Sequence, residues 1–306
     1  MWGSCGGSTG GEFMDETRAL VGGVALPLLL STLGLLIVWW GTAKRGQRWG
    51  EDEAAQRQDR ARVVASSWVV ALAAVVGVLA GFWRSDWPPT GARGWLPVVL
   101  GGVAVLAAGA GLPRVGALVA LLCPALLGAG LWLIARNKVK NTWGPWEAAA
   151  WIGVCAVLVT MAWAALTKAG RSRGWYPWLL LVGVGVCASV TIVLTGHIDP
   201  ALMAGGVCGV VGGGVLTGLL RPRVRGGAGV GLAGASLGVL MFYACALGTT
   251  PVACGVLITL AVLLAGLVSP DDTAGAVGGK GRLVRALVPA GLGAASIVVA
   301  IMNQPA

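Results

Sequence analysis

Ten apolar stretches of transmembrane length follow one another in this chain, and most of its charged residues lie in the short segments between them. An α-helix rises about 1.5 Å per residue, so about 20 apolar residues cross the hydrocarbon core of a bilayer. Inside that core each backbone polar group needs a partner within its own segment, which a helix provides. The sequence therefore predicts an all-α, polytopic membrane bundle of about ten transmembrane helices. The ten stretches are Ala19–Trp40, Val63–Trp83, Trp95–Leu112, Val115–Ala135, Trp146–Leu166, Trp175–Thr195, Pro200–Leu220, Gly226–Leu247, Thr250–Val268 and Leu283–Met302.

The composition argues against a soluble protein. Hydrophobic residues make up 57% of the chain and charged residues 11%, whereas a soluble domain carries about 25% charged residues. The net charge of +10 could suit a nucleic-acid-binding protein, but the basic residues flank the apolar stretches instead of forming one stripe. We therefore expect the lipid bilayer as partner, with anionic lipid headgroups at the cytoplasmic basic loops and no nucleic acid. A membrane-protein partner is left open.

The distribution of Lys and Arg predicts the orientation of the bundle. If the N-terminus lies outside, most of the 22 basic residues fall in loops on the inner side, as the positive-inside rule requires. We therefore expect both termini outside. The main exception is the sequence ARNKVK at 135–140, which adds three basic residues to the outer side. The abundance of glycine and alanine, with more arginine than lysine, is typical of a GC-rich genome. We expect the protein to be integral to a bacterial inner (plasma) membrane.

Two segments outside the apolar stretches have a distinct composition. Residues 1–18 are rich in glycine and lack the basic start of a signal peptide. We expect a disordered external tail at 1–18, followed by a transmembrane bundle with short loops at 19–306. The segment EDEAAQRQDRAR at 51–62 places its acidic residues before its basic ones, which suits the helix macrodipole. It is therefore predicted to be a helical extension of the second transmembrane helix.

The only histidine, His197, lies two positions before Asp199 between two apolar stretches. Catalysis by histidine needs a partner that fixes its tautomer and a nucleophile or metal within reach. Only Thr195 and Ser189 supply hydroxyls nearby. A structural interpretation explains the pair without chemistry, because Asp199 suits a helix N-cap and Pro200 suits the first helical position. We favour that interpretation and keep His197 and Asp199 as weak candidates.

The middle of each stretch lacks ionisable side chains. A charge at the bilayer centre costs about 2.5–3.5 kcal/mol or more, so an intramembrane charge usually marks a functional site. No Asp, Glu, Lys, Arg or His lies in the middle of a stretch, which argues against proton-coupled transport, aspartyl proteolysis and metal-dependent hydrolysis. The seven cysteines form no C-x-x-C pair, so we expect neither a metal site nor a cofactor. Ser236 stands in a G-x-S setting, but an intramembrane serine protease would also need a histidine on a later helix, and none follows.

Glycines recur at four-residue spacing on two of the predicted helices. They are Gly205, Gly209 and Gly213 in the seventh stretch, and Gly234 and Gly238 in the eighth. Such a row of small residues lets two helix backbones approach closely, so we interpret these faces as helix-packing faces. The alternative is a broken helix that exposes its backbone to a substrate along a pathway, with GVVGGGV at 209–215 as the best position.

Two classes of function remain open, and an enzyme is less favoured than either. The first hypothesis is a small-solute permease or exporter without an evident coupling-ion site. The alternative is a non-catalytic structural or assembly subunit of a membrane complex. A permease predicts a polar cavity at mid-depth, whereas a scaffold predicts a tightly filled interior and a flat apolar outer face.

Overall fold

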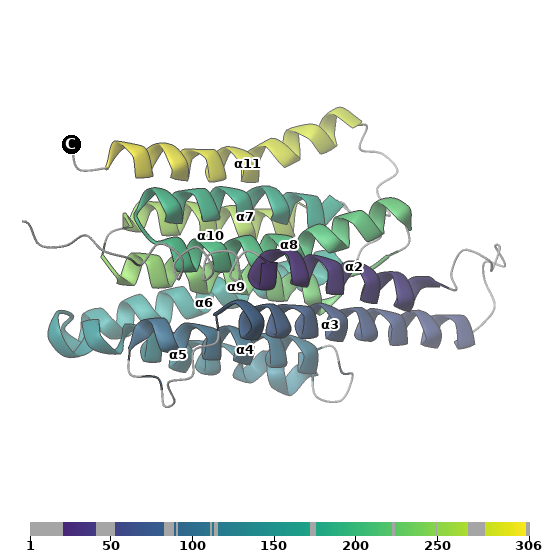
Figure 1. Ribbon diagram of the computed structural model, residues 1–306, viewed down its shortest axis with the longest axis horizontal. Helices are drawn as coiled ribbons and strands as arrows, with labels where there is room; N and C mark the ends of the chain where they lie inside the picture. Colours follow the sequence, from purple (N-terminus) through teal and green to yellow (C-terminus); the bar gives the residue numbers. More distant parts are fainter. Residues whose placement is uncertain are drawn as a thin grey trace, which may run out of the picture.

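The computed structural model describes residues 21–40, 53–82, 89, 91–110, 112, 116–171, 176–221, 224–248, 250–268 and 279–303, and it contains no strand among them. The first described element is a π-helical turn, η1 (Val21–Ala25), which continues directly into the first α-helix. The α-helices are α2 (Leu26–Trp39), α3 (Glu53–Phe82), α4 (Ala92–Ala110), α5 (Gly116–Asn141), α6 (Pro145–Gly170), α7 (Tyr176–Leu194), α8 (Ile198–Leu220), α9 (Ala228–Ala246), α10 (Val252–Leu267) and α11 (Gly279–Met302). They lie side by side along one long axis (Figure 1).

Seven segments in the described part are long and apolar enough to cross a membrane, which is compatible with a helical membrane bundle. They are Val21–Trp39, Arg60–Ala80, Ala92–Ala110, Pro145–Gly170, Tyr176–Leu194, Ile198–Leu220 and Ala228–Ala246. Two further apolar segments, α10 and Ala286–Met302 of α11, are shorter. The 16 residues of α10 span only about 24 Å at the rise of an α-helix. Helix length and composition therefore establish seven membrane-spanning candidates, and the predicted count of ten is not established by them.

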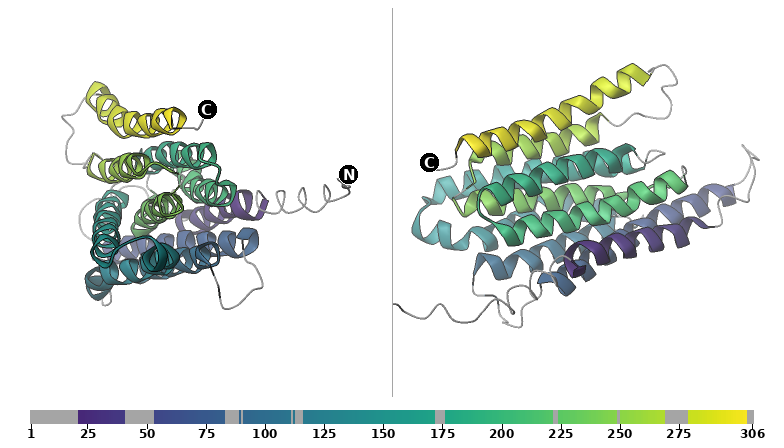
Figure 2. Two further views of the ribbon diagram at one scale, coloured as in Figure 1. Left: turned by 90° about the vertical axis from the view of Figure 1, so that its left-hand side faces the viewer. Right: turned by 45° about the horizontal axis from the view of Figure 1, so that its top comes forward.

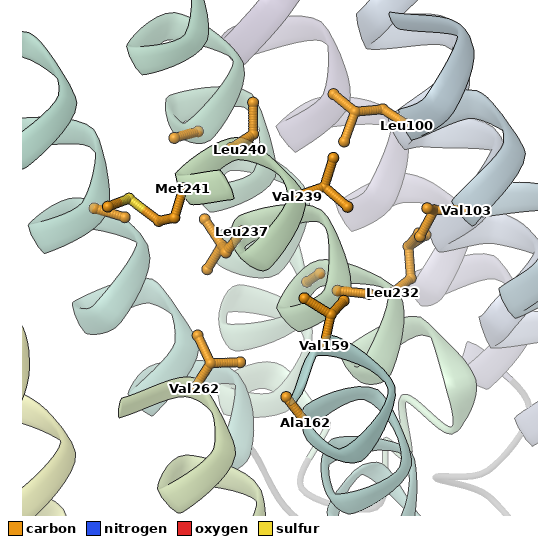
Figure 3. Close-up of a cluster of buried hydrophobic side chains, with 14 of the residues drawn as sticks. Leu100, Val103, Val159, Ala162, Leu232, Leu237, Val239, Leu240, Met241 and Val262 are labelled. Carbon is orange, nitrogen blue, oxygen red and sulfur yellow. The ribbon is translucent and has the colours of Figure 1, made fainter. Parts of the chain in front are cut away.

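Helix α9 forms the centre of the bundle. All of its residues from Ala228 to Ala244 are buried, and it packs against α3, α4, α5, α6, α7, α8 and α10. A helix that is apolar on every side is stable only where neighbours cover every side. The end-on view in Figure 2 shows α9 enclosed by the other helices. Figure 3 shows side chains of α9 pointing in several directions, Leu232 and Val239 among them, with Leu100 and Val103 of α4 and Val159 of α6 around the same core.

At one end of the bundle, two arginines cover the last tryptophans of α2. The guanidinium of Arg62, on α3, lies 6.0 Å from the ring centroid of Trp39, and that of Arg221, after α8, lies 5.9 Å from the ring centroid of Trp40. This end, called the Arg62 end below, holds the C-termini of the even-numbered helices α2 to α10 and the N-termini of the odd-numbered ones. Trp39 is only 2% exposed and donates an N–H to the Ser66 hydroxyl at 2.8 Å. The indole of Trp39 is therefore satisfied inside the protein, whereas a tryptophan at the end of a membrane helix often lies at the headgroups.

At the opposite end, polar contacts join helices that are far apart in the sequence. Arg93 of α4 forms an ion pair with Asp199 of α8. The hydroxyls of Thr195 and Thr250 lie 2.8 Å apart and connect the α7–α8 turn to the α9–α10 turn. This end is called the Lys138 end, after a residue described below. The alternation of helix ends is the arrangement of an up-and-down bundle, in which short loops join antiparallel neighbours.

Two helix boundaries decide where charged residues lie. Helix α3 begins at Glu53, which confirms the predicted helical extension before the second apolar stretch. Helix α5 continues to Asn141, so the basic ARNKVK sequence ends a helix and does not form a loop. Basic side chains in the last turn of a helix interact favourably with its dipole. The predicted disordered tail at 1–18 lies outside the described residues.

Candidate functional site

A cavity of about 250 Å³ opens at the Lys138 end between α6, α9 and α10. Near its mouth are residues of the α5 C-terminus and the first turn of α6, including Lys138, Trp143 and Glu147. Its deepest lining residues include Val159 and Thr259. Val159 lies 14 positions after the start of α6 at Pro145, which is about 21 Å along the helix. The cavity therefore reaches from one end of the bundle to about its mid-depth.

Most of the cavity wall is apolar. The remaining lining residues are Trp151, Cys155, Leu158, Gly238, Phe242, Cys245, Ala246, Val252, Gly255 and Val256. The Thr259 hydroxyl at the deep end donates to the Gly255 carbonyl oxygen of its own helix at 2.8 Å. That bond satisfies the hydroxyl proton without any ligand. The deep part thus offers apolar contact, and the charged groups are confined to the mouth. This differs from the polar cavity at mid-depth that is expected of a permease.

At the floor of this cavity and beyond it, toward the Arg62 end, the same helices are closed against one another. A Cβ atom added to Gly238 would lie 2.6 Å from Val159 Cγ2, and one added to Gly231 would lie 2.7 Å from the Trp163 carbonyl oxygen. A Cβ atom added to Gly234 would likewise meet the side chains of Leu166 and Val262. At the Arg62 end the Gly227 N–H donates to the Gly170 carbonyl oxygen at 2.9 Å, joining α9 to α6. The α6–α9–α10 group is therefore hollow in one half and filled in the other.

Lys138 separates this cavity from a second one. The second cavity, also of about 250 Å³, is lined by Ala92, Ile134, Asn137, Lys138, Asn141, Thr142, Tyr243, Ala246 and Leu247. Lys138 Nζ would lie 3.0 Å from a Cβ atom on Gly248, so the ammonium lies beside the C-terminus of α9. The positive charge of Lys138 is stabilised there, because the C-terminal end of a helix dipole is negative. Within the described part of the chain, Arg93 and Asp199 form an ion pair, and no carboxylate lies at ion-pair distance from Lys138.

The opening of α8 differs from the prediction at Asp199. His197 is the N-cap residue and makes no side-chain cap hydrogen bond. Asp199 lies in the first turn and pairs with Arg93, so its predicted role as the N-cap is wrong. The first turn still suits an acid because the helix dipole is positive there, and Pro200 fits because N–H groups of the first turn have no intrahelical acceptor. Partial burial lowers the pKa of His197 below its ordinary 6.5.

Ser236 lies at the centre of the bundle, far from the cavity mouth. Its side chain is 5% exposed, and it borders a small cavity of about 30 Å³. That volume is enough for about one water molecule. The other residues lining it are apolar or glycine, with Gly23, Pro27 and Gly206 among them. No titratable group thus faces Ser236 across this cavity.

The glycine faces lie against backbone and branched side chains. A Cβ atom on Gly209 would lie 2.6 Å from the Val24 carbonyl oxygen, and one on Gly205 would lie 3.5 Å from Val24 Cγ2. Gly213 faces Ser31 and Thr32 of α2. The α8 glycines therefore contact η1 and α2, whereas Gly234 and Gly238, described above, contact α6 and α10.

The described residues contain no group of three or more His, Cys, Asp or Glu side chains that could hold a metal ion. The six cysteines in that part of the chain are free thiols. Comparisons with protein-family models, with curated proteins and with solved structures found no match. The arrangement of side chains is thus the basis for an interpretation of function.

The cavity residues were not singled out by the sequence. Lys138 belongs to the one basic cluster that departs from the positive-inside pattern, and this departure was the available signal. Trp151, Phe242 and Val256 look like ordinary transmembrane residues in the sequence. Only the packing of α6, α9 and α10 brings them to one cavity.

Proposed function

We propose that the chain is a ten-span protein of a bacterial inner membrane, with the Arg62 end in the cytoplasm and both termini outside. The helices of the bundle run side by side along one axis, α10 and α11 included (Figures 1 and 2). Several basic residues lie at the Arg62 end, and Arg62, Lys168, Arg171, Arg221 and Arg225 are in the described part. The positive-inside rule favours the cytoplasm for such an end.

We further propose that it is a small-solute permease or exporter without an evident coupling-ion site. The supporting observation is the asymmetry of the α6–α9–α10 group, which is open to mid-depth from the Lys138 end and closed by glycine contacts toward the Arg62 end. Transport by alternating access requires a site that is reachable from one side at a time. In the closed half, Gly231 and Gly234 let α9 approach closely to Trp163 and Leu166 of α6, as small residues at helix contacts do.

A structural or assembly subunit is the second candidate. The observation that favours it is the complete burial of α9 between Ala228 and Ala244, which leaves the bundle centre filled with apolar side chains (Figure 3). A filled centre would keep the outer helix surfaces at fixed positions, so that partner proteins could bind to them. The two candidates differ in whether the closed half of α6 ever opens to the cytoplasm.

Cysteine accessibility distinguishes these candidates. In a variant that keeps only Cys155, an impermeant maleimide added outside intact cells should label this cavity residue. In a cysteine-free background, Leu166→Cys reports the closed half, since Leu166 is 0% exposed. Lys168→Cys, on the exposed last turn of α6, is the accessible control, and Leu237→Cys, in the buried middle of α9, reports global unfolding.

A permease should let the maleimide reach Leu166→Cys from the cytoplasmic side more slowly than Lys168→Cys but faster than Leu237→Cys. A scaffold should protect Leu166→Cys and Leu237→Cys equally, because only unfolding exposes either. Equal rates at these two positions, with Cys155 unreactive from outside, would reject the permease.

A further inference from the structure

We infer that the two cavities at the Lys138 end together bind a single-chain amphiphile with an anionic headgroup. The inference rests on the proposed permease function in naming this amphiphile as the transported substrate. Lys138 lines both cavities. It therefore lies at the junction between the second cavity, called the headgroup compartment below, and the first, called the chain compartment. The second has more residues with hydrogen-bonding side chains, so the headgroup of an amphiphile would lie there and its chain in the first.

The headgroup compartment is rich in hydrogen-bonding groups. Besides Lys138 it is lined by Asn137, Asn141, Thr142 and Tyr243, together with the apolar residues Ala92, Ile134, Ala246 and Leu247. Amide, hydroxyl and phenol groups all donate hydrogen bonds, and an ammonium adds up to three. Hydrogen bonds to an ionised acceptor are stronger than those between neutral groups. This set suits a carboxylate or phosphate better than a neutral headgroup.

The charge around the opening supports an anion. Arg136, Lys138 and Lys140 lie on the last turns of α5, and Glu147 lies in the first turn of α6. Glu147 is exposed, so solvent and salt screen its repulsion of an anion more than they screen a half-buried group. Lys138 has no carboxylate at ion-pair distance within the described part of the chain. Its charge is thus available to a ligand.

The chain compartment is apolar along its length. Trp151, Cys155 and Val256 line it toward the outside of the bundle, and Val159 and Phe242 toward α9. The hydroxyl at the deep end is already satisfied by its own helix. A polar solute would lose hydrogen bonds with water on entering such a space, whereas an alkyl chain gains from leaving water. The compartment therefore favours an acyl or similar chain.

The inference also accounts for the exception in charge distribution. In the proposed topology, the ARNKVK cluster puts three basic residues on the external side, against the positive-inside rule. An anion-binding function gives Lys138 a reason to be there. Arg136 and Lys140 are exposed and line neither cavity, so they serve as matched controls on the same helix.

The test is equilibrium binding of three probes that share one chain: dodecanoate, dodecanol and dodecylammonium. The full-length protein is held in nanodiscs of phosphatidylcholine, and empty nanodiscs measure partition into lipid. The wild type should bind dodecanoate more tightly than either other probe. Lys138→Ala should weaken dodecanoate binding about tenfold or more, the loss expected for a hydrogen-bonded charge, and should leave dodecanol binding nearly unchanged. Lys140→Ala and Arg136→Ala should change dodecanoate binding by less than about threefold.

A second variant tests the chain compartment independently. Val256→Trp should fill the cavity and weaken dodecanoate and dodecanol alike, and the 44% exposure of Val256 lets the larger side chain be accommodated in the fold. Retained dodecanol binding by Lys138→Ala shows that this variant is folded. Equal affinity of the wild type for dodecanoate and dodecanol would overturn the inference, as would equal losses in Lys138→Ala and Lys140→Ala.

Two further outcomes distinguish this inference from the binding of a bilayer lipid and from the proposed permease function. If phosphatidylglycerol in the nanodisc displaces dodecanoate and Lys138→Ala removes that competition, the occupant is a two-chain bilayer lipid and the single-chain proposal is wrong. Headgroup discrimination without cytoplasmic labelling of Leu166→Cys would keep the binding site and reject the permease. Labelling without headgroup discrimination would keep the permease and reject this substrate class.

Discussion

Gly209 of α8 lies directly against the backbone of Val24, so that a Cβ atom at Gly209 would come within 2.6 Å of the Val24 carbonyl oxygen. Val24 belongs to the π-helical turn η1. A backbone oxygen cannot move aside as a side chain can, so this contact requires the absence of a side chain on α8. Gly212, one turn along, has only Leu28 Cδ1 near its Cβ position, at 3.6 Å, which is an ordinary van der Waals distance.

These two glycines give a matched pair of substitutions. Gly209→Ala should destabilise the protein by about 1–3 kcal/mol, because the new methyl group overpacks against backbone. Gly212→Ala should be neutral or stabilise by up to about 1 kcal/mol, because alanine fits there and favours the helix. Thermal unfolding of the detergent-extracted protein measures both. Equal, small effects would mean that the α8 glycines reflect composition alone.

The helices could be predicted because apolar length alone specifies them. The seventh predicted stretch, Pro200–Leu220, corresponds to α8 at Ile198–Leu220. The observed helix boundaries differ from the predicted ones where charged residues continue a helix, as in α5, which ends at Asn141. The sequence could not place α9 at the centre with certainty, because several stretches are equally free of charge and only mutual packing decides which is enclosed.

The candidate site was less predictable than the fold. Three basic residues stand within 135–140, but of these only Lys138 lines the two cavities at this end. Some of its neighbours there, such as Tyr243, lie more than a hundred positions later in the sequence. Residue type alone does not decide the surroundings of Trp39, because a tryptophan at a helix end suits either the headgroup region or a buried hydrogen bond. The partner that decides, Ser66, lies on another helix.

The two tryptophans at the end of α2 should respond differently to substitution. Trp39→Phe should cost about 1 kcal/mol through the lost hydrogen bond to Ser66, and Trp39→Ala about 3–5 kcal/mol through the lost packing. Trp40 is 70% exposed, so Trp40→Ala should cost no more than about 1 kcal/mol, from its contact with Arg221. Chemical or thermal unfolding in detergent compares them. Similar losses at the two positions would contradict the buried role of Trp39.

His197 should make the protein less stable in mild acid. Burial lowers its pKa in the folded state, so the unfolded state binds a proton more readily. The stability is then complete above the unfolded pKa of about 6.5 and falls as the pH drops through that value. Thermal unfolding at pH 7.5 and 5.5 should show a larger decrease for the wild type than for His197→Gln, since carboxylates contribute equally to both. A wild type that gains stability at pH 5.5 relative to this variant would show that the pKa is raised instead.

The positions of three basic residues at or near helix ends test the ten-span topology. Arg171 follows α6 and Arg225 precedes α9, so both lie at the Arg62 end, whereas Lys140 lies in the last turns of α5 at the opposite end. Single cysteines at these positions, in a background without other cysteines, can be labelled by an impermeant maleimide in intact cells. With an external N-terminus and ten crossings, Lys140→Cys should react immediately, and Arg171→Cys and Arg225→Cys only after the membrane is opened. If α5 did not cross and only the seven apolar segments Val21–Trp39, Arg60–Ala80, Ala92–Ala110, Pro145–Gly170, Tyr176–Leu194, Ile198–Leu220 and Ala228–Ala246 spanned the bilayer, an external N-terminus would place Lys140 inside and Arg171 outside. The labelling of these two positions would then be reversed. Immediate labelling of both arginine positions would reject the proposed orientation, because basic clusters would then lie outside against the charge distribution that predicts it.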